Sequence, residues 1–260
     1  MTGAVAVRVW AIALRQPPGT VARLSALLGP DERRRAECDP RYAVAHAAVR
    51  QILGAHLGCP AGELRRALGP HGKPRLLGPG ADLAWNLSAG DDWALLALVP
   101  GADDGGADAG AGCDADPDTD PAPGPRPARP AVGIDVQRLV PGPAALRLAR
   151  RYYPGPEADL VTSAAGPEGA SDVYTRLWTY KEAYVKAFGG RLMNGLPTQA
   201  PPPGPPAPMA GPLGTCWVAA CVAPAGYRAA VAVTGPLPPR TYARTWDAAS
   251  LHITAFPSAN

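Results

Sequence analysis

The stretch from Leu177 to Gly190 constrains the fold of this chain more than any other. It closes on Gly189-Gly190, a pair typical of a helix end because glycine readily takes the left-handed conformation often needed there. Trp178, Glu182 and Lys186 are four residues apart, so they lie along one side of the predicted helix. The stretch therefore predicts a helix that displays an aromatic ring, a carboxylate and an ammonium together.

Lysine is rare in this chain. Only three of its 25 basic residues are lysines, namely Lys73, Lys181 and Lys186, so arginine serves wherever any cation will do. A compact ammonium is a point-charge donor suited to phosphate, whereas the guanidinium of arginine is a planar fork. Two of the three lysines flank Glu182 on one helix. This placement favours a site that handles anions over the alternative, a solvated helix face with a Glu–Lys pair.

A short β-type run over residues 131–137 provides a second polar surface. Alternate side chains of a strand share a face, so the valines and the isoleucine of the run point to the core while Asp135 and Gln137 point together to the other side. A carboxylate and an amide oxygen side by side can hold a hard cation such as Mg²⁺. The alternative is that Asp135 merely ends a strand.

Together the segments Gly133–Gln137 and Trp178–Lys186 resemble the paired signature of the 4′-phosphopantetheinyl transferases, and most closely their monomeric, surfactin-type subclass, which serves polyketide and peptide synthases. The resemblance implies an α+β fold of two similar α/β subdomains with pseudo-twofold symmetry and the active site at their interface. It also implies Mg²⁺-dependent transfer of the 4′-phosphopantetheine arm of coenzyme A to a serine of an apo acyl or peptidyl carrier protein, with release of adenosine 3′,5′-bisphosphate.

The resemblance also assigns roles to individual residues. It makes Asp135 and Glu182 carboxylate ligands of Mg²⁺, and Gln137 a third, neutral oxygen ligand or the holder of a metal-bound water. Glu182 or such a water takes the serine proton. Lys186 neutralises the phosphate under attack, and Lys181 supports the pyrophosphate.

For the nucleotide part of coenzyme A, the resemblance points to the N-terminal half. The predicted contacts are Arg33, Arg41, His71, Lys73, Pro74 and Ser88, with Lys181 and Lys186 from the second half. From the residues alone, each arginine can also be a solvated surface charge. Arg41 is favoured because it opens a predicted helix.

Two positions depart from the family pattern. Ala89 stands where the family commonly has a histidine, so one phosphate contact is missing or is supplied by another residue such as His71. Gln137 replaces a glutamate found in many members, which removes a charge and predicts weaker Mg²⁺ binding. These departures leave open a relative that binds coenzyme A without transferring the arm. A nucleotide kinase is less favoured because the chain has no Gly-x-x-x-x-Gly-Lys-Ser/Thr loop.

The composition changes abruptly at residues 101–130, which are rich in Gly, Ala, Asp and Pro without apolar periodicity. Such a stretch buries too little surface to offset its ordering entropy, so it is interpreted as a flexible insertion. The predicted organisation is an N-terminal subdomain over 1–100, this insertion, a C-terminal subdomain over 131–245 and a tail over 246–260.

Apolar periodicity and turn residues predict the remaining elements. They are an opening strand over 4–14, a short basic helix over 24–35, helices over 42–53 and 144–153, a buried strand over 93–99, a central helix from about 172, a proline-rich loop over 197–212, and a closing antiparallel pair over 216–222 and 227–233.

The chain has five cysteines, an odd number, and no CxxC spacing, which argues against a zinc site or a disulfide framework. Reduced thiols are therefore expected, and with them a cytoplasmic protein. The N-terminal apolar run is too short for a membrane span, and a net charge of +3 is too small to indicate nucleic acid. The expected partners are coenzyme A and an acidic carrier protein, with the chain as a monomer.

Overall fold

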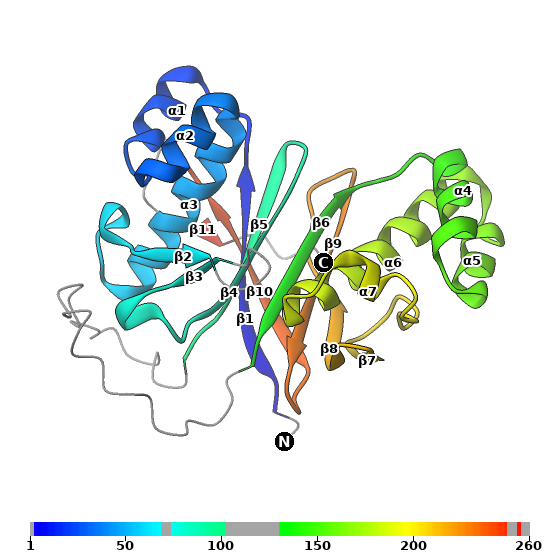
Figure 1. Ribbon diagram of the computed structural model, residues 1–260. Coiled ribbons are helices and arrows are strands. Elements are labelled where there is room, and N and C mark those ends of the chain that lie inside the picture. Colours follow the sequence, from blue (N-terminus) through cyan, green and yellow to red (C-terminus); the bar gives the residue numbers. More distant parts are fainter. Residues whose placement is uncertain (1–2, 69–73, 102–129, 249–253, 256–260) are drawn as a thin grey trace.

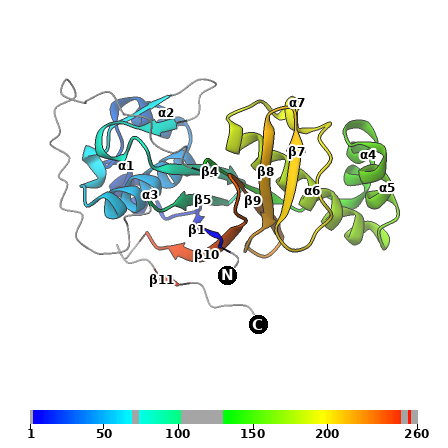
Figure 2. The same cartoon turned by 90° about the horizontal axis from the view of Figure 1, so that it is seen from below.

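The computed structural model describes residues 3–68, 74–101, 130–248 and 254–255. Nearly all of the predicted insertion 101–130 therefore lies outside the described residues. The described chain forms four layers, in the order helices, sheet, sheet, helices (Figure 1). Figure 2 shows the two groups of helices on the outer sides and the strands between them.

The first half runs from β1 to β5. Its elements are β1 (Val5–Ala13), α1 (Pro18–Ser25), α2 (Pro30–Cys38), α3 (Pro40–Leu57), a 3₁₀ turn (Ala61–Glu63), β2 (Arg66–Leu68), β3 (Pro74–Leu76), a second 3₁₀ turn (Gly78–Gly80), β4 (Ala84–Gly90) and β5 (Trp93–Val99).

The second half runs from β6 to β9, and two further strands follow it. Its elements are β6 (Val132–Arg138), α4 (Gly142–Tyr152), α5 (Gly155–Thr162), α6 (Gly166–Phe188), α7 (Leu192–Gly195), β7 (Ala207–Gly211), β8 (Gly214–Ala220) and β9 (Tyr227–Thr234), with β10 (Pro239–Trp246) and β11 (Thr254–Ala255) after them.

The two halves repeat one topology. In the first sheet β1 is antiparallel to β5, which is antiparallel to β4. In the second sheet β6 is antiparallel to β9, which is antiparallel to β8. Each first strand is followed by a group of helices before the sheet resumes, α1–α3 in the first half and α4–α7 in the second. The α+β architecture of two similar subdomains, predicted from the resemblance, is confirmed.

Three hydrophobic cores hold the layers together. One lies between α1–α3 and the first sheet, one between α4–α6 and the second sheet, and one between the two sheets. Strand β1 contributes to two of them, since Trp10 and Ile12 face α3 while Val7 and Val9 face the second sheet. Burial of both faces explains why the opening strand is apolar at nearly every position.

Some elements differ from the expectation. Helix α6 begins at Gly166, earlier than about 172, and the proline-rich loop contains β7. The most consequential difference is β10, inside the predicted C-terminal subdomain 131–245, which pairs in parallel with β1 of the first sheet. Its alternation is weak because much of the strand is half-buried, so a periodicity argument misses it.

Among the described cysteines, Cys38, Cys216 and Cys221 are free thiols, whereas Cys59 is disulfide-bonded. The expectation of reduced thiols therefore holds for the first three and is wrong for Cys59. Within the described ranges, no helix combines the length and apolar character that a membrane crossing requires.

Candidate active site

The candidate site lies where β6 packs against α6. Asp135 on β6 is buried, and its Oδ1 is 2.6 Å from Lys186 Nζ on α6. Lys186 Nζ is also 4.0 Å from Glu182 Oε2, one helical turn away. The structure thus brings together three of the five residues that the sequence analysis predicts to carry the chemistry.

Gly133 explains how the strand approaches the helix so closely. A Cβ at this position would overlap the backbone of Ala183, Lys186 and Ala187 on α6. Only glycine avoids this overlap, so Gly133 sets the depth at which Asp135, two residues later on the same face, meets the helix.

The first half reaches the site through β4. This strand lies at the edge of the first sheet and β6 at the edge of the second, and the two strands are in contact. Asn86 Oδ1 accepts a hydrogen bond from the Ile134 N–H (2.9 Å), and Ser88 Oγ accepts one from the Val136 N–H (3.3 Å). Side chains thus satisfy two edge N–H groups that a neighbouring strand would otherwise bind.

The carboxyl of Glu182 has a higher pKa than that of an ordinary surface glutamate. Burial raises the pKa of its carboxyl, Lys186 opposes that shift, and the nearby carboxylate of Asp135 adds to it. Two carboxylates that share one partly buried place favour a cation between them, because a cation relieves both the desolvation and the repulsion.

The residues present fit a cation such as Mg²⁺. Asp135 Oδ2 is buried and has no hydrogen-bond partner in the described part of the chain, as expected of an oxygen kept for a metal. Glu182 offers a second carboxylate, and Gln137 follows on the same face of β6. The described residues contain no cluster of three His, Cys, Asp or Glu side chains, so the third protein oxygen would be the amide of Gln137.

The structure corrects the prediction for Lys181. Its side chain is 0% exposed, its Nζ lies 2.8 Å from Glu157 Oε2, and it donates to the carbonyl oxygens of Leu196 (3.0 Å) and Thr198. A fully buried and fully paired ammonium cannot contact a pyrophosphate. Lys181 lies on a different side of α6 from Glu182 and Lys186. Its ammonium links α6 to α5 and to the segment that follows α6, so its role is structural.

The predicted nucleotide contacts are scattered. Arg41 donates from Nη1 to the Asp91 carbonyl (3.0 Å), and Arg33 donates from Nε to the Leu28 carbonyl (2.8 Å). Neither forms an ion pair with the Asp135 cluster in the structure as described. Ser88 is buried against β6, Pro74 opens β3, and Lys73 and His71 lie outside the described residues.

A pocket of about 550 Å³ in the first half gathers cations that the sequence analysis did not select. Pro74 lines it, together with Arg34, Arg35, Arg50 and Arg66. The neighbouring His46 shows the effect of these charges. Burial lowers the pKa of its imidazole to about 4, and the positive charges of Arg35 and Arg50 add to this shift. The signal in the sequence was the basic run over 33–35, of which Arg34 and Arg35 line this pocket and Arg33, selected in the sequence analysis, does not.

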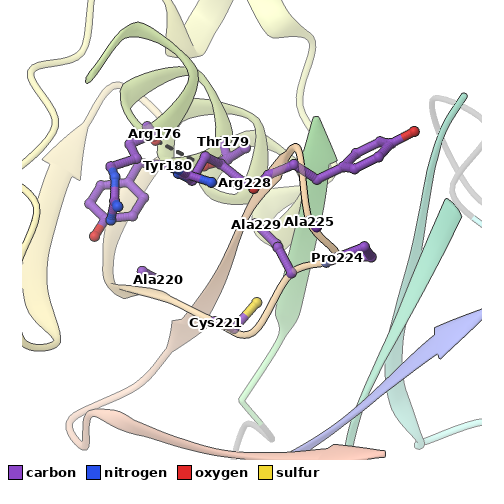
Figure 3. Close-up of a pocket in the computed structure, with 11 residues that line it drawn as sticks. Arg176, Thr179, Tyr180, Ala220, Cys221, Pro224, Ala225, Arg228 and Ala229 are labelled. Atoms are coloured by element: carbon purple, nitrogen blue, oxygen red, sulfur yellow. Dashed lines mark hydrogen bonds between the residues drawn. The ribbon is translucent and has the colours of Figure 1, made fainter. Parts of the chain in front are cut away.

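A smaller pocket of about 250 Å³ lies between α6 and the β8–β9 connection (Figure 3). Arg176 and Arg228 enter it and both bind Asp172, at 2.7 and 2.5 Å. Arg228 is the register partner of Gln137, so the pocket adjoins the end of the β6 face that carries Asp135 and Gln137. Burial raises the pKa of the Cys221 thiol in this pocket to about 12, so this thiol is not a ready nucleophile.

Comparison with known proteins supports one class. Residues 131–232 match the model of the 4′-phosphopantetheinyl transferase superfamily. The chain is 29% identical over 191 residues to the 4′-phosphopantetheinyl transferase HetI of Nostoc sp., which covers 70% of this chain and 68% of HetI. It is 25% identical over 194 residues to the putative 4′-phosphopantetheinyl transferase slr0495 of Synechocystis sp., covering 73% and 67% respectively.

The matched segment contains β6 and α6, the two elements that carry Asp135, Glu182 and Lys186. In these elements the chain is similar to enzymes of the 4′-phosphopantetheinyl transferase class. Strand β4 of the first half is in contact with β6 beside them.

Proposed function

We propose that the protein transfers the 4′-phosphopantetheine group of coenzyme A to a serine of an apo acyl or peptidyl carrier protein. A bond forms between the serine oxygen and the β-phosphorus of coenzyme A, the pyrophosphate bond breaks, and adenosine 3′,5′-bisphosphate leaves. The observation that carries this proposal is the cluster of Asp135, Glu182 and Lys186 at the contact of β6 and α6.

Negative charge is the main obstacle to this reaction, because a hydroxyl must attack a pyrophosphate and a phosphorylated group must leave. Positioning and charge neutralisation are the main means of catalysing such transfers. Asp135, Glu182 and Gln137 would hold Mg²⁺, which supplies charge neutralisation of the pyrophosphate when bound.

The chain's own residues supply the remaining steps. Lys186 is 27% exposed while it is bonded to Asp135, so its ammonium can meet an incoming phosphate. The raised pKa of Glu182 suits a proton acceptor better than an ordinary surface carboxylate would. Glu182, or a water that it holds, takes the serine proton.

The arginine-lined pocket beside Pro74 is our proposed place for the nucleotide end of coenzyme A. Arg34 and Arg35 would supply there the charge that the resemblance expected from Arg33 and from the histidine replaced by Ala89. Arg41 is a second proposed contact for the nucleotide end, since its side chain is half-exposed at the start of α3.

The surfactin-type subclass, the polyketide and peptide synthase partners, the monomeric state and the cytoplasmic location belong to the same proposal. The net charge of +3 suits an acidic carrier protein.

Intact-protein mass spectrometry of apo carrier proteins, incubated with this protein, coenzyme A and Mg²⁺, tests the function directly. We expect a gain of one phosphopantetheine per carrier, lost with EDTA and lost with the Glu182→Gln variant. No gain on several acyl and peptidyl carriers, with coenzyme A binding confirmed separately, would instead support the relative that binds coenzyme A without transferring the arm.

A further inference from the structure

Ser88 occupies an unusual position at the seam between the two halves. It belongs to β4 of the first half, is 4% exposed, and its hydroxyl meets two side chains of the second half. Ser88 Oγ donates to Asp135 Oδ1 (2.9 Å) and accepts from Lys186 Nζ (3.0 Å). With the Val136 N–H as a third partner, the hydroxyl uses its one donor and both acceptor sites.

This arrangement makes the two oxygens of Asp135 unequal. Oδ1 is taken by Ser88 and Lys186, whereas Oδ2 is buried without a hydrogen-bond partner among the described residues. A carboxylate fixed through one oxygen presents the other in a constant direction. Groups that orient a metal ligand in this way commonly affect metal affinity as much as some ligands do.

We propose that Ser88 is a positioning residue of the transferase site. Its hydroxyl fixes the orientation of Asp135 so that Oδ2 faces the cation. The same hydroxyl holds the ammonium of Lys186 beside Asp135, from where that side chain can extend to the phosphate. It acts through these two side chains, and this role is distinct from the nucleotide contact implied by the family resemblance. The inference rests on the proposed function for its kinetic effect, but its cation-binding effect is independent of that function.

Asn86 provides a matched control. It is two residues before Ser88 on the same face of β4, it is also buried (7% exposed), and it also accepts a hydrogen bond from a β6 N–H. Its side chain accepts a hydrogen bond from the Ile134 N–H, so it contributes to the contact between β4 and β6. A variant at Asn86 therefore disturbs the contact of the two sheets while leaving the bonds of Asp135 in place.

The experiment compares Ser88→Ala, Ser88→Thr and Asn86→Ala in the full chain. Binding of Mn²⁺ to the protein free of coenzyme A is followed by electron paramagnetic resonance, and kcat and KM for coenzyme A are measured with an apo carrier. Thermal unfolding of each variant reports its stability, and Ser88→Cys, which keeps the volume but loses the strong donor, replaces Ser88→Ala if the latter does not fold.

For Ser88→Ala we expect Mn²⁺ affinity and kcat to fall about 10-fold or more, with little change in KM for coenzyme A. Ser88→Thr keeps the hydroxyl and should recover most of both. Asn86→Ala should lower the melting temperature while keeping Mn²⁺ affinity and kcat near those of the wild type.

Three results would overturn the inference: a raised KM for coenzyme A with kcat and Mn²⁺ affinity unchanged in Ser88→Ala, an equal loss of Mn²⁺ binding in Asn86→Ala, or no rescue by threonine. If the wild type modifies no carrier at all, the proposed function fails, yet the Mn²⁺ measurements still decide the role of Ser88.

Discussion

The two halves of this chain share a framework, but the cluster of Asp135, Glu182 and Lys186 lies in the second. The long helices α3 and α6 each end on a glycine in the left-handed conformation, Gly58 and Gly189, both with φ of 66°. Eight positions before each glycine stands a buried cation, Arg50 in α3 and Lys181 in α6.

The two cations are used in the same way. Arg50 binds Glu32 of α2 (Nε–Oε2 2.7 Å), and Lys181 binds Glu157 of α5 (Nζ–Oε2 2.8 Å); each glutamate lies in the first turn of the helix that precedes the long one. Both cations also donate to carbonyls of the segment that follows the long helix, Ala61 and Leu64 in one case and Leu196 and Thr198 in the other.

The difference appears at the neighbouring positions. Counted from the closing glycines, Glu182 and Lys186 of α6 correspond to Gln51 and Ala55 of α3. Gln51 accepts a hydrogen bond from the Trp246 indole (3.0 Å), a structural contact with β10. The buried cation is thus part of a repeated framework, and the residues proposed to be catalytic occupy helix positions that do not take part in that buried ion pair.

The strongest test of this difference is substitution of the reactive pair. Glu182→Gln and Lys186→Ala should each lower transfer by about 10³-fold, since each removes a charge at the reacting phosphate while folding persists. The equivalent change in the first half, Gln51→Ala, should leave transfer close to that of the wild type. Near wild-type turnover by either α6 variant, measured by carrier mass spectrometry, would refute the role of that residue.

The shared framework can be broken in either half. Lys181→Ala should destabilise the protein by about 3–5 kcal/mol, because it leaves the buried Glu157 without its cation. Arg50→Ala should also destabilise it, but by less, because Arg66 still forms an ion pair with Glu32. Urea unfolding measures the loss. The double variant Glu157→Leu/Lys181→Met should recover much of the stability, and a Lys181→Ala protein of undiminished stability would show that the pair is not a framework element.

The charge of the cation site can be changed without touching the framework. Gln137→Glu adds a third carboxylate to those of Asp135 on β6 and Glu182 on α6, and should lower the Mg²⁺ concentration needed for half-maximal activity by about 10-fold. Titration of activity against Mg²⁺ checks this. An unchanged requirement would remove Gln137 from the set of residues that contact the metal, and Arg228→Lys at its register partner serves as a control.

The smallest effect concerns pH. The raised pKa of Glu182 means that its protonated form favours the folded state, so its contribution is complete below the pKa of an unfolded glutamate and is lost as the pH rises through the folded value. Glu182→Gln is neutral throughout. Measured by urea unfolding in EDTA, the variant should therefore gain stability relative to the wild type between acidic and neutral pH, whereas Gln51→Ala should show no such trend.

Much of the site could be predicted from the sequence because its signals are local. Strand alternation placed Asp135 and Gln137 on one face, and helical spacing placed Glu182 and Lys186 on one side of α6. Both predictions depend only on the periods of a strand and a helix.

The sequence was misleading where the partner lies far along the chain. The scarcity of lysine made Lys181 look like a phosphate ligand, but its partner Glu157 comes from another helix, and its burial is a property of the packed core. In the same way β10 could not be predicted, because its stability depends on the edge of β1.

The sequence alone was enough to predict the strand and the helix that carry Asp135, Glu182 and Lys186, because the periods of a strand and a helix are local properties. The packing of the fold had to be known to see that Lys186 lies beside Asp135 while Lys181 is held by the buried Glu157. It alone placed Ser88 against Asp135, 47 positions away, because contacts between edge strands of different sheets leave no periodic trace in the chain.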